Sequence, residues 1–283
     1  MIRPQKATID INGLRLHYLQ WNPDAGQGPS PKSIVLLHGS NGNARIWEEV
    51  GGRTAAHIHT VALDLRGHGD SQWSEGAAYG CKDYAGDLEQ LIARLDLQRV
   101  VLVAHSMSVY HSLRYWAGHP DNVAGLILVD IEAAARPEHV TLLRTAGAKP
   151  EPRFESFDQV LQRERRFFPF ADEAVLRAFV ASNLRNVAAD DGAAFGLTYK
   201  YDRASLAAFE AYDEWANLRQ VRCPVIFVYG ADSQMVRPEV MRQMVEAVPG
   251  SRAVKVEQAG HMPHVDNPSD FAEAVLLFCQ ETD

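Results

Sequence analysis

Short, continuous apolar runs alternate with segments of helical periodicity along most of this chain. The runs lie at residues 33–38, 58–64, 99–105, 123–130, 224–230 and 251–257, and the helical patterns lie near residues 43–52, 80–95, 107–119, 236–247 and 268–280. A strand that is apolar on both faces has to be covered on both, which is the situation of a parallel strand in an α/β protein. The pattern therefore predicts a mostly parallel sheet with helices on both of its faces.

The chain begins with the pattern of a β-hairpin. Residues 7–11 and 14–20 alternate between polar and apolar side chains around the turn dipeptide Asn12-Gly13. This hairpin is expected to form an antiparallel edge and to bring the sheet to eight strands. Residues 22–32, rich in Gly, Pro and Ser, are expected to be a surface connection to the next strand.

The alternation stops between residues 131 and 222. This stretch shows helical patterns near residues 136–147, 155–168, 171–185 and 203–218 and no convincing strand. An insertion after one strand of an open α/β sheet lies over the carboxyl ends of the strands, where such sheets bind their ligands. We interpret residues 131–222 as a helical cap, or lid, on a core domain formed by residues 1–130 and 223–283.

Composition and charge argue against several classes of protein. The 283 residues include 28 Lys and Arg against 36 Asp and Glu, and the net charge of −8 argues against nucleic-acid binding. The most apolar run, residues 123–131, is too short to cross a bilayer, and the N-terminus lacks the apolar stretch of a signal peptide. Cys81, Cys223 and Cys279 are odd in number and far apart, as expected of reduced thiols. These features predict a cytoplasmic protein that binds neither nucleic acid nor membrane.

Ser106 is the candidate nucleophile. It follows an apolar run in the segment VLVAHSMSVY and precedes a helical pattern, with Ala104 and Ser108 two positions to either side. A nucleophile on a tight strand-to-helix turn needs small residues at these places, because the turn crowds them against the neighbouring strand and helix. Serine is also a common helix cap, which is the alternative role. A catalytic role further requires a base, an acid and an oxyanion pocket elsewhere in the chain.

The candidate base is His261, which follows the last predicted strand and Gly260, and His264 is its rival. Two residues compete for the carboxylate that holds the imidazole in the correct tautomer. Asp130 ends the strand after the nucleophile helix, and Asp232 follows the next strand. Either aspartate preserves the chain order Ser, Asp, His.

The segment HGSNG, residues 38–42, is the candidate oxyanion loop. It follows the first predicted parallel strand, where a turn can direct backbone N–H groups towards a substrate oxygen. We expect the amides of Ser40 and Met107 to flank this oxygen, with Asn41 as the alternative to Ser40.

The segments LLHGSNG, DLRGHGDS, AHSMS, LVDIE and AGHMPH resemble the motifs of the α/β-hydrolase superfamily, and the likeness covers nearly the whole chain. The resemblance implies an α/β-hydrolase fold with an inserted helical cap. It also implies hydrolysis through a covalent acyl-serine, with no metal and no organic cofactor. DLRGHGDS is a structural loop in this superfamily and is assigned no chemistry.

The position of the acid departs from the commoner pattern of the superfamily. Most members place the aspartate about four residues before a proline, and here that position is Gln234, two residues after Asp232. The chain is similar in this respect to (E)-2-(acetamidomethylene)succinate hydrolases, capped amide hydrolases that use an earlier aspartate. Asp130 matches that earlier aspartate, and we therefore favour it as the acid.

The cap differs from that of the same enzymes, which bind a dicarboxylate through arginines, one of them in an Arg-Tyr-Pro motif. The present chain has Phe167-Phe168-Pro169 at this place, with Arg166 directly before. The aromatic pair favours an apolar or ring-bearing substrate over a small diacid. Phe167, Phe168 and Arg166 are the predicted substrate-binding residues.

These observations predict a serine hydrolase that cleaves an ester, lactone or amide bond of a small molecule. Two alternatives stay open: hydrolysis of a C–C bond in vinylogous diketone acids, and a non-hydrolytic or ligand-binding protein on the same fold. The expected partner is a small-molecule substrate, and assembly as a homodimer also stays open.

Overall fold

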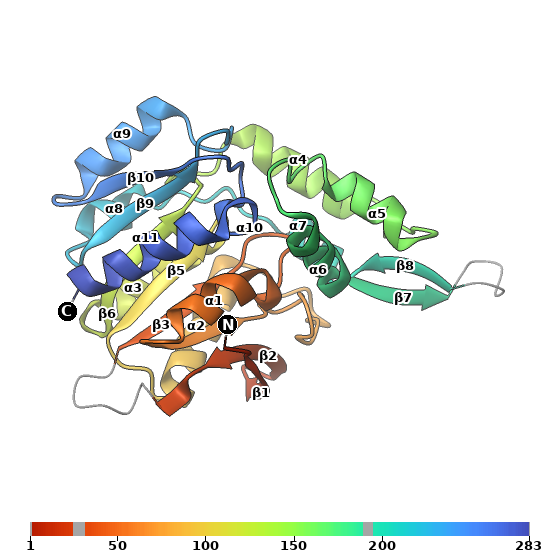
Figure 1. Ribbon diagram of the computed structural model, residues 1–283, viewed down its shortest axis with the longest axis horizontal. Helices are drawn as coiled ribbons and strands as arrows, with labels where there is room; N and C mark the ends of the chain where they lie inside the picture. Colours follow the sequence, from red (N-terminus) through yellow and green to blue (C-terminus); the bar gives the residue numbers. More distant parts are fainter. Residues whose placement is uncertain (1, 25–31, 189–194, 283) are drawn as a thin grey trace.

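The computed structural model describes residues 2–24, 32–188 and 195–282. Within them the main sheet has eight strands in the order β1-β2-β4-β3-β5-β6-β9-β10 (Figure 1). The strands are β1 (Gln5–Ile11), β2 (Leu14–Trp21), β3 (Ser33–Leu37), β4 (His59–Leu63), β5 (Val100–His105), β6 (Val123–Val129), β9 (Val225–Gly230) and β10 (Arg252–Val256). β1 pairs with β2 and β2 pairs with β4 in antiparallel fashion, and the other pairs of the main sheet are parallel. The predicted sheet is confirmed. Of the predicted surface connection 22–32, residues 25–31 lie outside the described residues.

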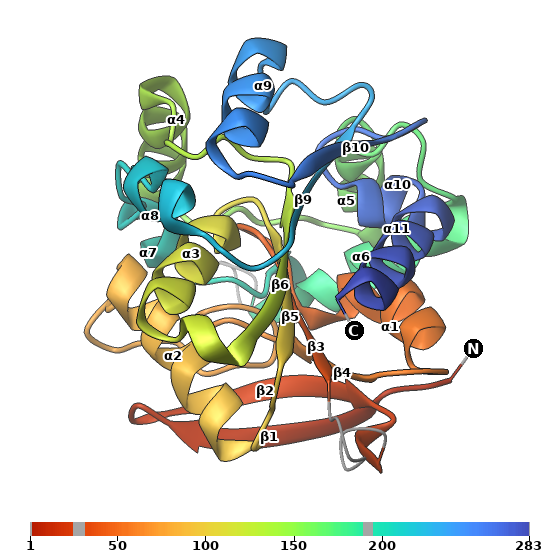
Figure 2. The same cartoon turned by 90° about the vertical axis from the view of Figure 1, so that its left-hand side faces the viewer.

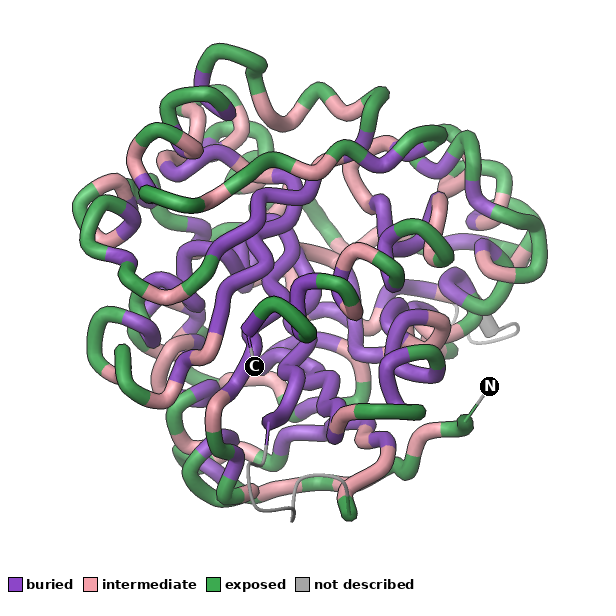
Figure 3. The backbone as a smooth tube through the Cα atoms, turned by 60° about the vertical axis from the view of Figure 1, so that its left-hand side comes forward, coloured by how far each residue is buried: buried purple, intermediate pink, exposed green. Residues whose placement is uncertain are grey.

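Helices cover both faces of the sheet, as predicted. They are α1 (Glu48–Thr54), α2 (Cys81–Arg94), α3 (Ser108–Gly118), α9 (Pro238–Ala247), α10 (Pro263–Asp266) and α11 (Pro268–Glu281). Figure 2 shows α1 and α11 on one face and α2 and α3 on the other. Successive residues of β5 enter different cores, since Leu102 packs with α2 and α3 whereas Val103 packs with α1 and α11. In Figure 3 the buried parts of the chain gather in the centre of the molecule.

α11 illustrates how the local sequence forms a covering helix. Asn267 precedes it, and its side chain accepts a hydrogen bond from the backbone N–H of Asp270. Such a cap satisfies one of the free donors at a helix start. Phe271, Val275 and Phe278 then recur at helical spacing and are fully buried against the sheet.

The segment between β6 and β9 contains both helices and a hairpin. Its elements are α4 (Pro137–Ala148), α5 (Phe157–Glu164), α6 (Glu173–Asn183), β7 (Leu184–Ala188), β8 (Phe195–Tyr199), α7 (Arg203–Ala207) and α8 (Trp215–Gln220). The expectation of no strand here was wrong, because β7 and β8 pair with each other outside the main sheet. β7 shows no regular alternation of apolar residues, which is why the pattern did not reveal it. The boundaries of the cap, 131–222, stay a prediction.

The predicted helix at residues 203–218 is two short helices, α7 and α8. Between them the chain pairs with the start of the inserted segment, since the Ala135 N–H donates to the Tyr212 carbonyl and the Glu214 N–H donates to the Ala133 carbonyl. These contacts between distant residues outweigh local helical propensity. The predicted helix at 155–168 likewise ends early, with α5, at Glu164.

Candidate active site

Ser106 lies in the turn between β5 and α3 with a φ angle of 53°. This left-handed conformation is rare for a residue with a side chain and persists only where the surroundings hold it. Here the Ser106 N–H donates to the Val129 carbonyl at 2.9 Å, and the Ser106 carbonyl accepts from the Val109 N–H at 2.9 Å. The turn thus places the hydroxyl at the carboxyl end of the central strand, as the sequence predicted.

Loop 38–42 packs directly against this turn. Ser108 Oγ donates to the His38 carbonyl at 2.6 Å, so this small residue of the turn also binds the loop. A Cβ atom on Gly39 would lie 2.8 Å from Ser106 Cβ, which is too close for two carbon atoms that are not bonded. Only glycine fits at this position. The two segments are therefore as close as their backbones allow.

The two residues whose amides are the predicted oxyanion donors lie side by side. Ser40 Oγ donates a hydrogen bond to Met107 Sδ at 3.2 Å. The next residue, Asn41, has a φ of 65°, and its carbonyl accepts from Asn183 Nδ2 at 2.8 Å. α6 of the inserted segment thereby fixes the loop, and Ser40 stays adjacent to the nucleophile turn.

His261 and Asp130 form a hydrogen-bonded pair, with 2.8 Å between His261 Nδ1 and Asp130 Oδ2. A carboxylate oxygen only accepts, so Nδ1 is the donor and Nε2 keeps a free lone pair. The Asp130 side chain is fully buried and also accepts from Ser233 Oγ at 2.5 Å and from the Gly230 N–H at 3.3 Å. These bonds fix the carboxylate, which in turn fixes the orientation of the imidazole.

The rival residues lie elsewhere. Asp232 is exposed, and its backbone N–H donates to the Ala259 carbonyl. His264 is buried and stacks on Trp47 with the ring centroids 4.0 Å apart. Burial and the neighbouring His261 lower the pKa of His264 well below its ordinary value, so this ring is neutral. The structure brings together Asp130 and His261, the pair that the sequence favoured.

His105 connects the nucleophile turn to the loop of the base. Its Nε2 lies 2.9 Å from the His261 carbonyl, and because a carbonyl only accepts, Nε2 is the donor. Complete burial, with His261 nearby, lowers the pKa of His105 well below its ordinary value. The ring is therefore neutral, and its single N–H is committed to this bond.

A cavity of about 400 Å³ opens beside Ser106 and His261. Among the described residues, no hydrogen bond joins these two side chains, although both line the cavity. Catalytic hydrogen bonds are often long or misaligned before substrate binds, so the lack of this bond does not argue against a shared role. The inserted segment forms an aromatic wall that consists of Phe167, Phe168, Phe179, Tyr199 and Tyr201.

The predicted substrate-binding residues are only partly at this cavity. Phe168, which is 4% exposed, and Phe167, which is 63% exposed, both line it. Arg166 is exposed and does not line the cavity, whereas Arg163, one turn earlier in α5, does. The chain turns after Glu164, so the cation that reaches the cavity is Arg163 and not the predicted Arg166.

Glu164 and Tyr199 also line the cavity, and the sequence analysis missed both. Tyr199 Oη donates to Glu164 Oε1 at 2.5 Å. Burial raises the pKa of Glu164, although the bond from Tyr199 opposes this, and burial likewise raises the pKa of Tyr199. One signal was available, because Glu164 follows Phe157, Val160 and Leu161 on the apolar stripe of α5. Tyr199 belongs to β8, a strand that was not expected.

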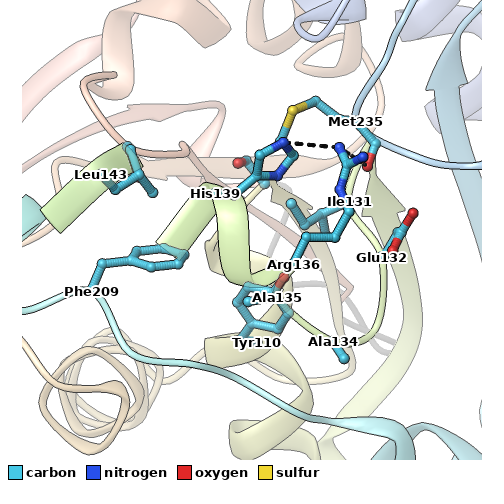
Figure 4. Close-up of a pocket in the computed structure, with 12 residues that line it drawn as sticks. Tyr110, Ile131, Glu132, Ala134, Ala135, Arg136, His139, Leu143, Phe209 and Met235 are labelled. Atoms are coloured by element: carbon cyan, nitrogen blue, oxygen red, sulfur yellow. Dashed lines mark hydrogen bonds between the residues drawn. The ribbon is translucent and has the colours of Figure 1, made fainter. Parts of the chain in front are cut away.

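A second and much smaller cavity, of about 30 Å³, adjoins Ser106 (Figure 4). It shares five lining residues with the larger one: Ser40, Ser106, His139, Leu143 and Met235. Ser106 therefore lines two spaces of different size.

Within the described residues, the one grouping with the spacing of metal ligands is His17, Asp64 and Asp70. The Asp64 carboxylate already binds the His17 ring at 2.7 Å and the backbone N–H groups of Ala44 and Asp70. These bonds occupy the carboxylate and give Asp64 a structural role in the loop after β4.

Residues 34–274 match the model of the alpha/beta hydrolase family. The chain belongs to this family. It is 27% identical to a 3-hydroxybutyrate-oligomer hydrolase of Cupriavidus necator over 278 residues, and the match covers 93% of this chain and 92% of that relative. It is 26% identical to a 2-(acetamidomethylene)succinate hydrolase of Mesorhizobium japonicum over 270 residues, 95% and 93% of the two chains.

Solved structures share the fold of this alpha/beta hydrolase. The crystal structure of an (E)-2-(acetamidomethylene)succinate hydrolase superposes with a TM-score of 0.83 at 24% identity and covers 98% of this chain and 99% of its own. The predicted resemblance to these enzymes is confirmed. In the described part of the chain, we find no helix with the length and apolar character that a membrane span requires.

Proposed function

We propose that this alpha/beta hydrolase is a serine hydrolase that cleaves an ester, lactone or amide bond of a small apolar or aromatic molecule. The observation that carries the proposal is the His261–Asp130 pair at the cavity that Ser106 also lines. In this arrangement the imidazole of His261 shares one cavity with the hydroxyl of Ser106, which lies on a turn with a strained backbone. That combination is what nucleophilic catalysis by serine requires.

In the proposed reaction, Ser106 Oγ attacks the carbonyl carbon of the substrate while its proton passes to His261 Nε2. Asp130 stabilises the imidazolium and keeps Nδ1 protonated. The tetrahedral intermediate collapses by breaking the bond to the leaving group, which takes the proton from Nε2. A water molecule then attacks the acyl-serine, with the same nitrogen taking and returning a proton, and the acid and Ser106 are released.

The backbone amides of Ser40 and Met107 are the proposed oxyanion donors. The contact between their side chains supports this role, because it holds both residues beside Ser106. Each such donor is typically worth ~3 kcal/mol of activation free energy.

The inserted segment 131–222 is proposed to be the cap that selects the substrate, over a core of residues 1–130 and 223–283. The aromatic side chains of this segment, Phe167 and Phe168 among them, line the same cavity as Ser106. Such a surface favours a ring or an apolar chain.

The test is labelling by a fluorophosphonate together with hydrolysis of phenyl acetate. We expect the protein to be labelled at Ser106, and Ser106→Ala to lose both labelling and hydrolysis. Ser112→Ala is the matched control, because Ser112 is a buried serine in α3 that lines neither cavity, and it should retain both activities. Full hydrolysis by Ser106→Ala would refute the role of Ser106. No labelling at Ser106 together with no hydrolysis by the unchanged protein would refute the proposal and favour a non-hydrolytic role.

A further inference from the structure

The small cavity beside Ser106 has the size of a few atoms. Its volume of about 30 Å³ is room for roughly two water molecules, whereas the larger cavity holds about 400 Å³. In Figure 4, Phe209 and Leu143 lie on one side of the small cavity, and Ile131 and Glu132 lie on the other. A substrate bound to Ser106 thus has one narrow and one wide space for the two groups attached to its carbonyl carbon.

The position of His261 decides which group enters which space. His261 lines the large cavity and is not among the residues around the small one. The base has to return its proton to the leaving group, so the leaving group must lie on the side of the imidazole. This places the leaving group in the large aromatic cavity and the acyl group in the small cavity.

Two side chains that line the small cavity carry a polar hydrogen without a hydrogen-bond acceptor. Among the described residues, neither Tyr110 Oη nor Arg136 Nε has a hydrogen-bond partner, although both atoms are buried, and Arg136 Nε has only an ion pair with Glu138 Oε1 at 3.8 Å. Tyr110 is fully buried, and leaving a buried polar group unpaired costs about 1–3 kcal/mol. Both residues line the small cavity, so an oxygen placed there would satisfy them.

Glu132 and His139, two further polar residues around the small cavity, are already engaged. Glu132 accepts from Arg237 Nε at 2.8 Å and from its Nη2 at 2.7 Å. His139 Nε2 accepts from Arg136 Nη2 at 3.0 Å, a bond drawn in Figure 4. The unmet requirement in this space is therefore for an acceptor oxygen.

Building on the proposed serine hydrolase, we propose that the small cavity is its acyl subsite. It takes an acyl group with about two non-hydrogen atoms beyond the carbonyl carbon, the outer one an oxygen, as in a glycolyl ester. Tyr110 Oη and Arg136 Nε donate to that oxygen. The large cavity takes an apolar or aromatic leaving group.

The experiment compares phenyl esters that differ only in the acyl group and follows the release of phenol. Glycolate and propionate have the same size, but the glycolate ester is intrinsically more reactive. The glycolate-to-propionate ratio of kcat/KM is therefore divided by the same ratio for hydrolysis by hydroxide, and it then measures recognition of the oxygen. We expect this corrected ratio to be at least about fivefold to tenfold, the effect of a single hydrogen bond. Phenyl propionate should exceed phenyl hexanoate by at least about tenfold, because the longer chain does not fit.

Variants separate the subsite from general effects. Tyr110→Phe should lower the glycolate-to-propionate ratio severalfold, and the preference that is left is the share of Arg136. Tyr84→Phe is the matched control, because Tyr84 is another buried tyrosine whose hydroxyl has no partner among the described residues, and it lines neither cavity. It should leave the ratio unchanged. Phe209→Ala should enlarge the space and raise the relative rate on phenyl hexanoate.

The outcomes distinguish this inference from the function on which it rests. Hydrolysis that becomes faster with acyl length, or a glycolate-to-propionate ratio that Tyr110→Phe does not change, overturns the acyl subsite and leaves the serine hydrolase standing. No hydrolysis of any ester, together with no labelling of Ser106, overturns the proposed function itself.

Discussion

Replacing Asp130 by Asn is expected to remove nearly all esterase activity while leaving the fold intact. The change exchanges one carboxylate oxygen for an NH₂ group of the same size. The Gly230 N–H donates to Asp130 Oδ1, so the amide oxygen of the new side chain takes that place. The NH₂ group then occupies the position of Oδ2, which faces His261 Nδ1 at 2.8 Å and Ser233 Oγ at 2.5 Å, and the serine hydroxyl accepts from it instead of donating.

The size of the effect follows from the tautomer of His261. An NH₂ group donates, so it favours an unprotonated Nδ1 and places the ring proton on Nε2. Nε2 then has no lone pair to accept the proton of Ser106. A comparable exchange in a serine protease lowers kcat by about 10⁴, which corresponds to about 5.5 kcal/mol of activation free energy. We expect a loss of this order.

The assay is the kcat for phenyl acetate, with circular dichroism and the melting temperature as checks of folding. Asp232→Asn is the matched control, because Asp232 is the rival acid and is exposed, and it should retain activity within about twofold. A folded Asp130→Asn protein with more than a tenth of the original kcat would refute the reasoning. An inactive Asp232→Asn protein would move the role of the acid to that residue.

Three further predictions concern stability and the oxyanion loop. A Cβ atom on Gly147 would overlap the backbone of α7, so Gly147→Ala should lower the free energy of unfolding in urea by about 1–3 kcal/mol. Burial raises the pKa of Glu132, but the hydrogen bonds from Arg237 outweigh burial and hold the pKa below 4.5. The Glu132–Arg237 pair therefore stabilises the fold at neutral pH, and this contribution is lost as the pH falls below about 4.5. Arg237→Gln should therefore lower the melting temperature at pH 7 and weaken its decline between about pH 5 and 3. Ser108→Ala removes the bond to the His38 carbonyl and should lower kcat for phenyl acetate about threefold to tenfold.

The sheet was predictable because its strands are buried on both faces. Runs such as residues 33–38 and 99–105 consist of apolar side chains that no amphipathic helix would show, and β3 and β5 lie within them. The inserted segment was predicted less well. Its hairpin and the break between α7 and α8 depend on contacts between distant residues, such as that of Ala135 with Tyr212, which local patterns do not contain.

Order along the chain and small flanking residues predicted where Ser106, Asp130 and His261 lie. These residues follow the ends of strands, and topology alone brings such ends to one edge of the sheet. The lining of the cavities was harder to predict, because it depends on which side of a short helix faces inward. Arg163 and Arg166 are three residues apart, and the turn after Glu164 decides which one reaches the cavity.

The bond from His105 to the His261 carbonyl has a mechanical consequence. It couples the backbone next to the base to the residue next to the nucleophile. If the inserted segment shifts when a substrate enters, this bond keeps the backbone of His261 attached to the end of β5, directly beside Ser106. The distance between the two residues then depends on the sheet and not on the position of the inserted segment.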